Sequence, residues 1–75
     1  MYIILEIQEQ TAGGTPATIT YIESTLNEAM SKYHDILHYA AVSELFRHSV
    51  VVMTTDGKYV ARESYKHEVM DNESA

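Results

Sequence analysis

TLNEAMSKYHDILHYAAVS, residues 25–43, carries the one long helical pattern in this chain of 75 residues. Thr25 and Glu28 have the S/T-x-x-E spacing of a capping box, in which a hydroxyl and a carboxylate satisfy free backbone donors at a helix start. The apolar positions that follow recur three and four residues apart, as on an amphipathic helix: Leu26, Ala29, Met30, Tyr33, Leu37, Ala40 and Ala41. The stretch therefore predicts a helix over residues 25–43.

Each side of this helix carries the pattern of a β-hairpin. Residues 2–8 and 17–22 are strand-like and are separated by Gly13-Gly14-Thr15-Pro16, whose residues favour turns. Residues 48–54 and 58–66 are joined through Asp56-Gly57, a pair typical of tight hairpin turns. The sequence thus predicts an α+β fold of order ββαββ, a four-stranded antiparallel sheet with one helix on one face, over residues 1–67. Residues 68–75 are expected to form a flexible acidic tail.

Two of the predicted strands differ in how their apolar residues are distributed. In residues 2–8, Ile3, Leu5 and Ile7 share one face, which we take as the core face. In contrast, residues 48–54, HSVVVMT, are apolar on both faces, which is typical of a strand covered on both sides. One helix covers only one face of a sheet. The strand at residues 48–54 therefore indicates that another layer is supplied from outside the chain.

The size of the chain points to the same conclusion. Seventy-five residues bury a small core, and the absence of Cys excludes disulfides and thiolate zinc sites as supplements. We therefore expect a homo-oligomer. No apolar run reaches the roughly 20 residues of a membrane span, and the start of the chain lacks the basic region of a signal peptide. The expected location is the cytoplasm, with no membrane partner.

Charge argues against nucleic acid as a partner. The formal net charge is −6, whereas proteins that bind nucleic acid neutralise phosphates with clustered Lys and Arg. All five Lys and Arg residues and all four His residues nevertheless fall between positions 32 and 67. This half of the chain is where an anionic ligand would find donors.

Metal binding and nucleophilic catalysis have little support in the sequence. His34 and His38 are four residues apart and face the same way on a helix, but no HExxH or carboxylate-rich pattern accompanies the pair. A metal site would need a third ligand, for which the candidates are His48, His67 and Glu44. No Ser lies in a glycine-elbow pattern, and no phosphate-binding loop is present. We predict no metal, no cofactor and no enzymatic activity.

One group of side chains does suit a small ligand that carries a phosphate and an aromatic ring. Arg, His and Ser donate hydrogen bonds to phosphate oxygens, and a Tyr ring offers a face on which a base stacks. The predicted ligand-binding residues are Tyr33, His34, Ser43, Arg47, His48, Ser49, Tyr65 and His67.

Several of these residues also carry a family resemblance. SKYHDIL (31–37), AAVS (40–43), HSVV (48–51) and ESYKHE (63–68) resemble stretches in very small proteins of phages and prophages of Gram-positive gut bacteria. Among such proteins are the Sequestin and Lockin sponges, compact oligomers that sequester ADP-ribose-derived signals made by bacterial immune TIR enzymes. The resemblance implies a homo-oligomer that binds a nucleotide such as a cyclic ADP-ribose isomer and so inhibits anti-phage signalling of the Thoeris kind.

Two alternatives stay open on the sequence. The protein could bind a host protein through its sheet face or an edge strand. It could also be a small phosphodiesterase in which His34 or His48 acts as the general acid or base.

Overall fold

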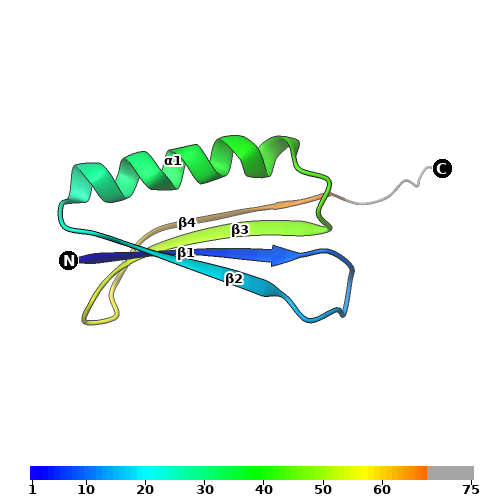
Figure 1. The fold of residues 1–75 in the computed structure, drawn as a ribbon, viewed down its shortest axis with the longest axis horizontal. Coiled ribbons are helices and arrows are strands. Elements are labelled where there is room, and N and C mark those ends of the chain that lie inside the picture. The colour runs from blue at the N-terminus through cyan, green and yellow to red at the C-terminus, as the bar shows by residue number, and fades with distance from the viewer. Residues whose placement is uncertain (68–75) are drawn as a thin grey trace.

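The computed structural model describes residues 1–67 and confirms the predicted ββαββ order and the α+β class (Figure 1). The predicted acidic tail, residues 68–75, lies outside the described residues. The elements are β1 (Tyr2–Glu9), β2 (Ala17–Glu23), α1 (Leu26–Val42), β3 (Arg47–Thr54) and β4 (Tyr59–Lys66). All four strands form one antiparallel sheet in the order β2-β1-β3-β4.

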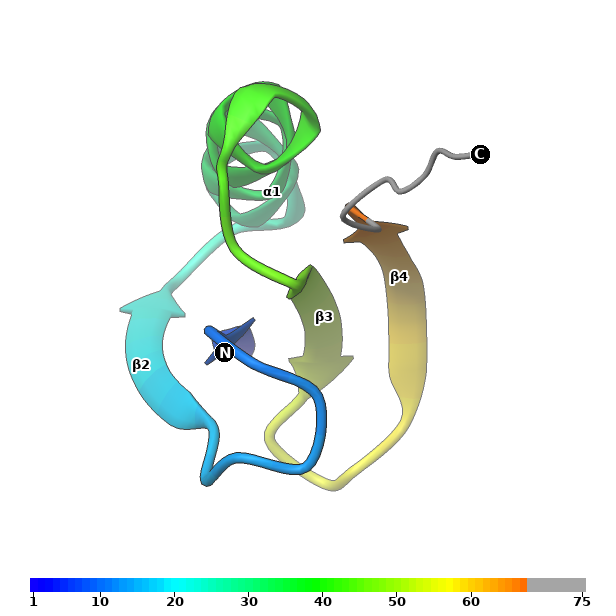
Figure 2. The same ribbon diagram turned by 90° about the vertical axis from the view of Figure 1, so that its right-hand side faces the viewer.

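The two central strands, β1 and β3, come from different hairpins. Because β1 is antiparallel to both β2 and β3, the strands β2 and β3 run in the same direction and α1 connects them across β1. This split arrangement places α1 over β1 and β3 on one face of the sheet (Figures 1 and 2). The outer edges belong to β2 and β4.

Helix α1 begins as predicted. The Thr25 hydroxyl accepts a hydrogen bond from the Glu28 amide at 3.2 Å, while the Glu28 carboxylate accepts one from the Ser24 hydroxyl instead of from the Thr25 amide. The buried stripe of the helix consists of Ala29, Tyr33, Ile36 and Ala40. It includes Ile36, which the predicted apolar positions omitted, whereas Leu26 and Ala41 from that prediction are exposed.

The core lies between α1 and one face of the sheet, which we call the helix face. Its fully buried strand residues are Ile4, Val50 and Val52. The predicted core face of β1 was therefore wrong: strand register puts Ile4 and Glu6 under the helix, and Ile3, Leu5 and Ile7 on the opposite side. The reason is that Tyr21 and His48 donate hydrogen bonds to the Glu6 carboxylate and offset the cost of burying it, so that a charged residue occupies a core position.

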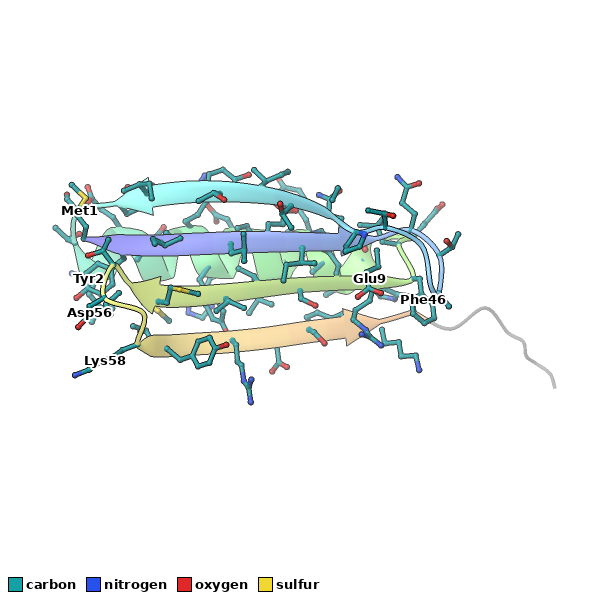
Figure 3. All side chains as sticks on the ribbon, turned by 90° about the horizontal axis from the view of Figure 1, so that it is seen from below. Met1, Tyr2, Glu9, Phe46, Asp56 and Lys58 are labelled. Atoms are coloured by element: carbon teal, nitrogen blue, oxygen red, sulfur yellow. The ribbon has the colours of Figure 1, made fainter. Side chains whose placement is uncertain are left out.

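The opposite side of the sheet, which we call the open face, has no covering layer in the described chain (Figure 3). Its centre is a row of aliphatic and thioether side chains from the two central strands: Ile3, Leu5, Ile7, Val51 and Met53. Threonines of β2 border this row on one side, and Ser64 and Arg62 of β4 border it on the other. No helix in residues 1–67 has the length and apolar character needed to cross a membrane.

Candidate functional site

The alternation of side chains along β3 divides the predicted ligand-binding residues between the two faces. His48 pairs in register with Gln8 and points to the helix face, whereas Arg47 and Ser49 point to the open face. One ligand cannot touch all three from a single side of the sheet. The predicted set therefore does not form one cluster.

On the helix face, the structure brings Tyr33, Tyr65 and His67 close together. Tyr33 lies on the buried stripe of α1, on the side of β4. Burial and the nearby Glu63 and Tyr65 raise the pKa of its hydroxyl. The Tyr65 and His67 rings stack with centroids 6.4 Å apart, and His67 Nε2 lies 2.9 Å from the Ala40 carbonyl oxygen, to which it donates. His67 thus ties the end of β4 to the last turn of the helix.

His34 and Ser43 occupy the two ends of this helical region. His34 is exposed and meets the edge of the Tyr33 ring at a centroid distance of 5.3 Å. Ser43 caps the C-terminus of α1 through its amide, which donates to Ala40, and its hydroxyl is buried without a hydrogen-bond partner among the described residues. Neither residue lies in one of the cavities described below.

His48 belongs to a buried network centred on Glu6. His48 Nε2 donates to Glu6 Oε2 at 2.6 Å, Gln8 Nε2 donates to the same oxygen at 2.8 Å, and the Tyr21 hydroxyl reaches Glu6 Oε1 at 3.3 Å. Burial acts to raise the pKa of Glu6, but the three hydrogen bonds and the charge of His48 outweigh it, so that the pKa lies below its usual value. Glu6 is 8% exposed and His48 is 4% exposed, which makes this network structural rather than a surface for ligands.

A shallow groove of about 330 Å³ lies above this network, between α1 and β2. Tyr21 and Lys32 meet in it, with the ammonium nitrogen 4.6 Å from the ring centroid. Burial and the charge of Glu6 raise the pKa of Tyr21. Two carboxylates, Glu6 and Asp35, line the groove with one Lys, Lys32, so its charges do not favour an anionic ligand.

A second cavity, of about 410 Å³, lies at the end of the sheet where β1 ends and β3 begins, and Phe46 lines it (Figure 3). Two cations lie near the Phe46 ring. Lys66, which also lines the cavity, is 5.5 Å from the ring centroid, and Arg47, which does not line it, is 5.6 Å away. The remaining lining residues are Gln10, Thr11, Ala12, Glu44 and His67. We call this cavity the Phe46 pocket.

The distribution of charge along the strands favours anions on the open face, to which Lys66 of this pocket belongs. All three strand cations, Arg47, Arg62 and Lys66, lie on the open face. Of the four strand carboxylates, only Glu9 shares that face, and it pairs with Arg47 at 3.4 Å. The open face therefore carries an excess of positive charge although the whole chain is acidic.

Sequence reasoning missed both Phe46 and Glu6. Phe46 is the only Phe in the chain and directly precedes Arg47, which is a signal that could have been read as an aromatic ring beside a cation. Glu6 was visible as the one carboxylate inside an aliphatic strand, but its partner His48 is 42 residues away and only the β1–β3 register brings the two together. Within residues 1–67 no three His, Asp or Glu side chains gather as potential metal ligands.

Comparisons with protein-family models, with curated proteins and with solved structures give no match to this chain.

Proposed function

We propose that this protein is a non-enzymatic binding protein that captures a small ligand with an aromatic ring and a phosphate group in the Phe46 pocket. The observation that carries the proposal is the position of the Phe46 ring, which lines a cavity of about 410 Å³ and has Arg47 and Lys66 at 5.6 and 5.5 Å from its centroid. The resemblance of the sequence to phage sponges narrows the ligand to an ADP-ribose-derived immune signal, such as a cyclic ADP-ribose isomer. Capture of that signal would inhibit bacterial anti-phage signalling.

The chemistry of the pocket suits this ligand class. A base stacked on an aromatic side chain contributes about 1–3 kcal/mol, and the flat ring accepts any base because each has a π-face. Lys66 offers a compact charge in the pocket, and Arg47, beside the Phe46 ring, offers a planar fork of donors for phosphate oxygens. The volume falls within the range of roughly 300–1,000 Å³ that is typical of small-molecule pockets.

Self-association through the open face is part of the proposal. The aliphatic row at its centre resembles a core surface more than a solvated one, and a second copy is the nearest partner of matching chemistry. Lys66 both lines the Phe46 pocket and lies on the open face, so a copy packed there would border the pocket. An interface of this kind would enclose a ligand that the open pocket of one chain holds only in part.

Capture without turnover also agrees with the positions of two imidazoles: His67 lines the pocket but its Nε2 donates to the Ala40 carbonyl oxygen, and His48 is buried. The carboxylate of Glu6 orients His48 as in many acid–base pairs, but His48 is 4% exposed and does not line the Phe46 pocket. A ligand in the pocket would therefore meet stacking and charged groups but not this imidazole.

Isothermal titration with cyclic ADP-ribose isomers and with ADP-ribose tests the proposal. We expect Phe46→Leu to weaken binding by at least about tenfold, since tenfold corresponds to 1.4 kcal/mol of lost stacking. Tyr59→Leu is the matched control, because Tyr59 lies 5.6 Å from Arg62 but outside the pocket. No heat from any of these ligands, or equal affinities for Phe46→Leu and the parent protein, would contradict the proposal.

The aliphatic open face favours a second candidate function, docking onto a host protein. A sheet face of this kind is an interaction surface even where no small ligand is involved. Capture from a lysate depleted of nucleotides, with Leu5→Lys as the comparison, separates the two candidates. A host protein retained by the parent chain, lost with Leu5→Lys and kept with Phe46→Leu would favour this second function.

A further inference from the structure

Strand β2 forms one outer edge of the sheet, and nothing in residues 1–67 lies alongside it (Figure 2). Most of its residues are exposed, including Ile19 at 41% and Ile22 at 54%. Helix α1 lies mainly over β1 and β3 and reaches β2 through Lys32, which lies over the Tyr21 ring, while the outer backbone edge of β2 pairs with no strand of the sheet. The backbone donors and acceptors on the outer side of β2 are therefore available to another strand.

The two edges of the sheet differ in how they resist such pairing. β4 is interrupted by a register shift opposite Val52 and Met53, and it carries Arg62, Glu63 and Lys66. Bulges and charges of this kind are the usual protection of an edge strand. In contrast, β2 pairs with β1 in unbroken register over seven residues, and residues 17–22 contain no charge and no Pro.

We propose that β2 pairs antiparallel with β2 of a second copy, so that two four-stranded sheets become one continuous sheet of eight strands. The chemistry that selects this partner is the strand's own self-complementarity. A two-fold axis at Thr20 places Thr20 opposite the partner's Thr20 and pairs all seven residues of Ala17–Glu23. Thr–Thr neighbours of this kind stabilise antiparallel pairs.

The same register gives the two exposed isoleucines apolar or uncharged neighbours. On the helix face, Ile19 lies opposite the partner's Tyr21, and on the open face Ile22 lies opposite the partner's Thr18. No pair of like charges meets, because Glu23 lies opposite the partner's Ala17. The pairing also joins the open faces of both copies into one wider surface.

This interface is separate from the ligand-binding proposal, since it uses no residue of the Phe46 pocket. It is also separate from face-to-face packing, which uses side chains rather than the backbone edge. A protein that forms both contacts would be a closed tetramer with two kinds of isologous interface.

Amide hydrogen exchange followed by NMR tests the edge pairing directly in the parent protein. In a free edge strand only alternate amides donate to the neighbouring strand, so protection alternates along the chain. We expect the amides of residues 18–22 to be protected without alternation, while β4 keeps the alternating pattern. Alternating protection along β2 in the associated protein would overturn the proposal.

A pair of Lys substitutions supplies the second test. Ile19→Lys places a charge against the partner's Tyr21 at the edge of β2, and Val60→Lys places one at an equally exposed position, 40%, on β4. We expect the mass in light scattering to halve for Ile19→Lys and to stay unchanged for Val60→Lys, with circular dichroism confirming the fold of each. An unchanged mass for Ile19→Lys, or a parent protein that is strictly monomeric, would contradict the inference.

Discussion

The two faces of this sheet reverse the usual distribution of polarity. The face under α1 contains a carboxylate and an imidazole, Glu6 and His48, whereas the face without a layer carries most of the aliphatic side chains of β1. An antiparallel sheet with one solvated face normally shows the opposite arrangement. The difference indicates that the open face is made to be covered, and that the helix face can hold the Glu6 carboxylate because His48, Gln8 and Tyr21 donate hydrogen bonds to it.

The largest loss of stability is expected from a substitution that breaks the polar network of the helix face. His48→Ala leaves the buried Glu6 carboxylate without its closest donor, and we expect the free energy of unfolding to fall by about 3 kcal/mol or more. Urea unfolding followed by circular dichroism measures this loss.

The control removes both partners of the buried pair. Replacing Glu6 and His48 together by Leu removes the charge as well as its donor, so we expect the double variant to be more stable than His48→Ala alone. A loss below about 1 kcal/mol for His48→Ala would show that the network is not what lets the helix face hold a carboxylate.

Neighbouring aliphatic residues of β1 give the second contrast between the faces. Ile4 is fully buried under α1, so Ile4→Ala is expected to cost about 3 kcal/mol at every protein concentration. Leu5 points to the open face, and Leu5→Ala is expected to cost about 1 kcal/mol in dilute solution and more where copies associate. Unfolding measured at two protein concentrations distinguishes the two variants. A loss of stability for Leu5→Ala that is the same at both concentrations would contradict this difference between the faces.

The pH dependence of stability tests the buried network of the helix face in the parent protein. The pKa of Glu6 is lowered in the folded protein, so near the usual value of 4.5 the unfolded chain binds more protons than the folded one. Stability from Glu6 is therefore present above that pH and is lost as the pH falls through the folded pKa. Glu6→Gln is expected to flatten this part of the stability profile, and an unchanged acid dependence in that variant would contradict the assignment.

The smallest expected effect concerns the ion pair of the open face. Arg47 and Glu9 lie 3.4 Å apart, and the Arg47 side chain is 41% exposed, so solvent screens the pair. A double-mutant cycle with Arg47→Ala and Glu9→Ala is expected to give a coupling of about 0.5 kcal/mol. A coupling as large as the loss for His48→Ala would mean that the open face is already shielded from water.

The sequence was a good guide to the elements and a poor guide to the faces. The cap at Thr25, the Asp56-Gly57 turn and the aliphatic runs are local signals, and each predicted strand and the helix agree with the structure within a residue or two. The face of β1 was assigned wrongly because Glu6 is compensated by His48 across the β1–β3 register, and register is not a local property.

The predicted ligand-binding residues illustrate the same limit. Residues 47–49 are adjacent in the sequence, but alternation along β3 sends Arg47 and Ser49 to the face opposite His48. The Phe46 pocket brings Lys66 and His67 together with Phe46 and the β1–β2 loop, which meet only through the tertiary fold. Tyr33, Tyr65 and His67 do lie together, but as a contact between α1 and β4.

The account depends most on the open face being an interface between copies, and the mass of Leu5→Lys in solution tests this most directly. Light scattering of the parent protein and of this variant is compared, with circular dichroism to confirm the fold and Ile7→Lys as a second variant on the same face. We predict that each variant has half the mass of the parent protein and keeps its folded spectrum. Folded variants with the mass of the parent protein would contradict the central claim.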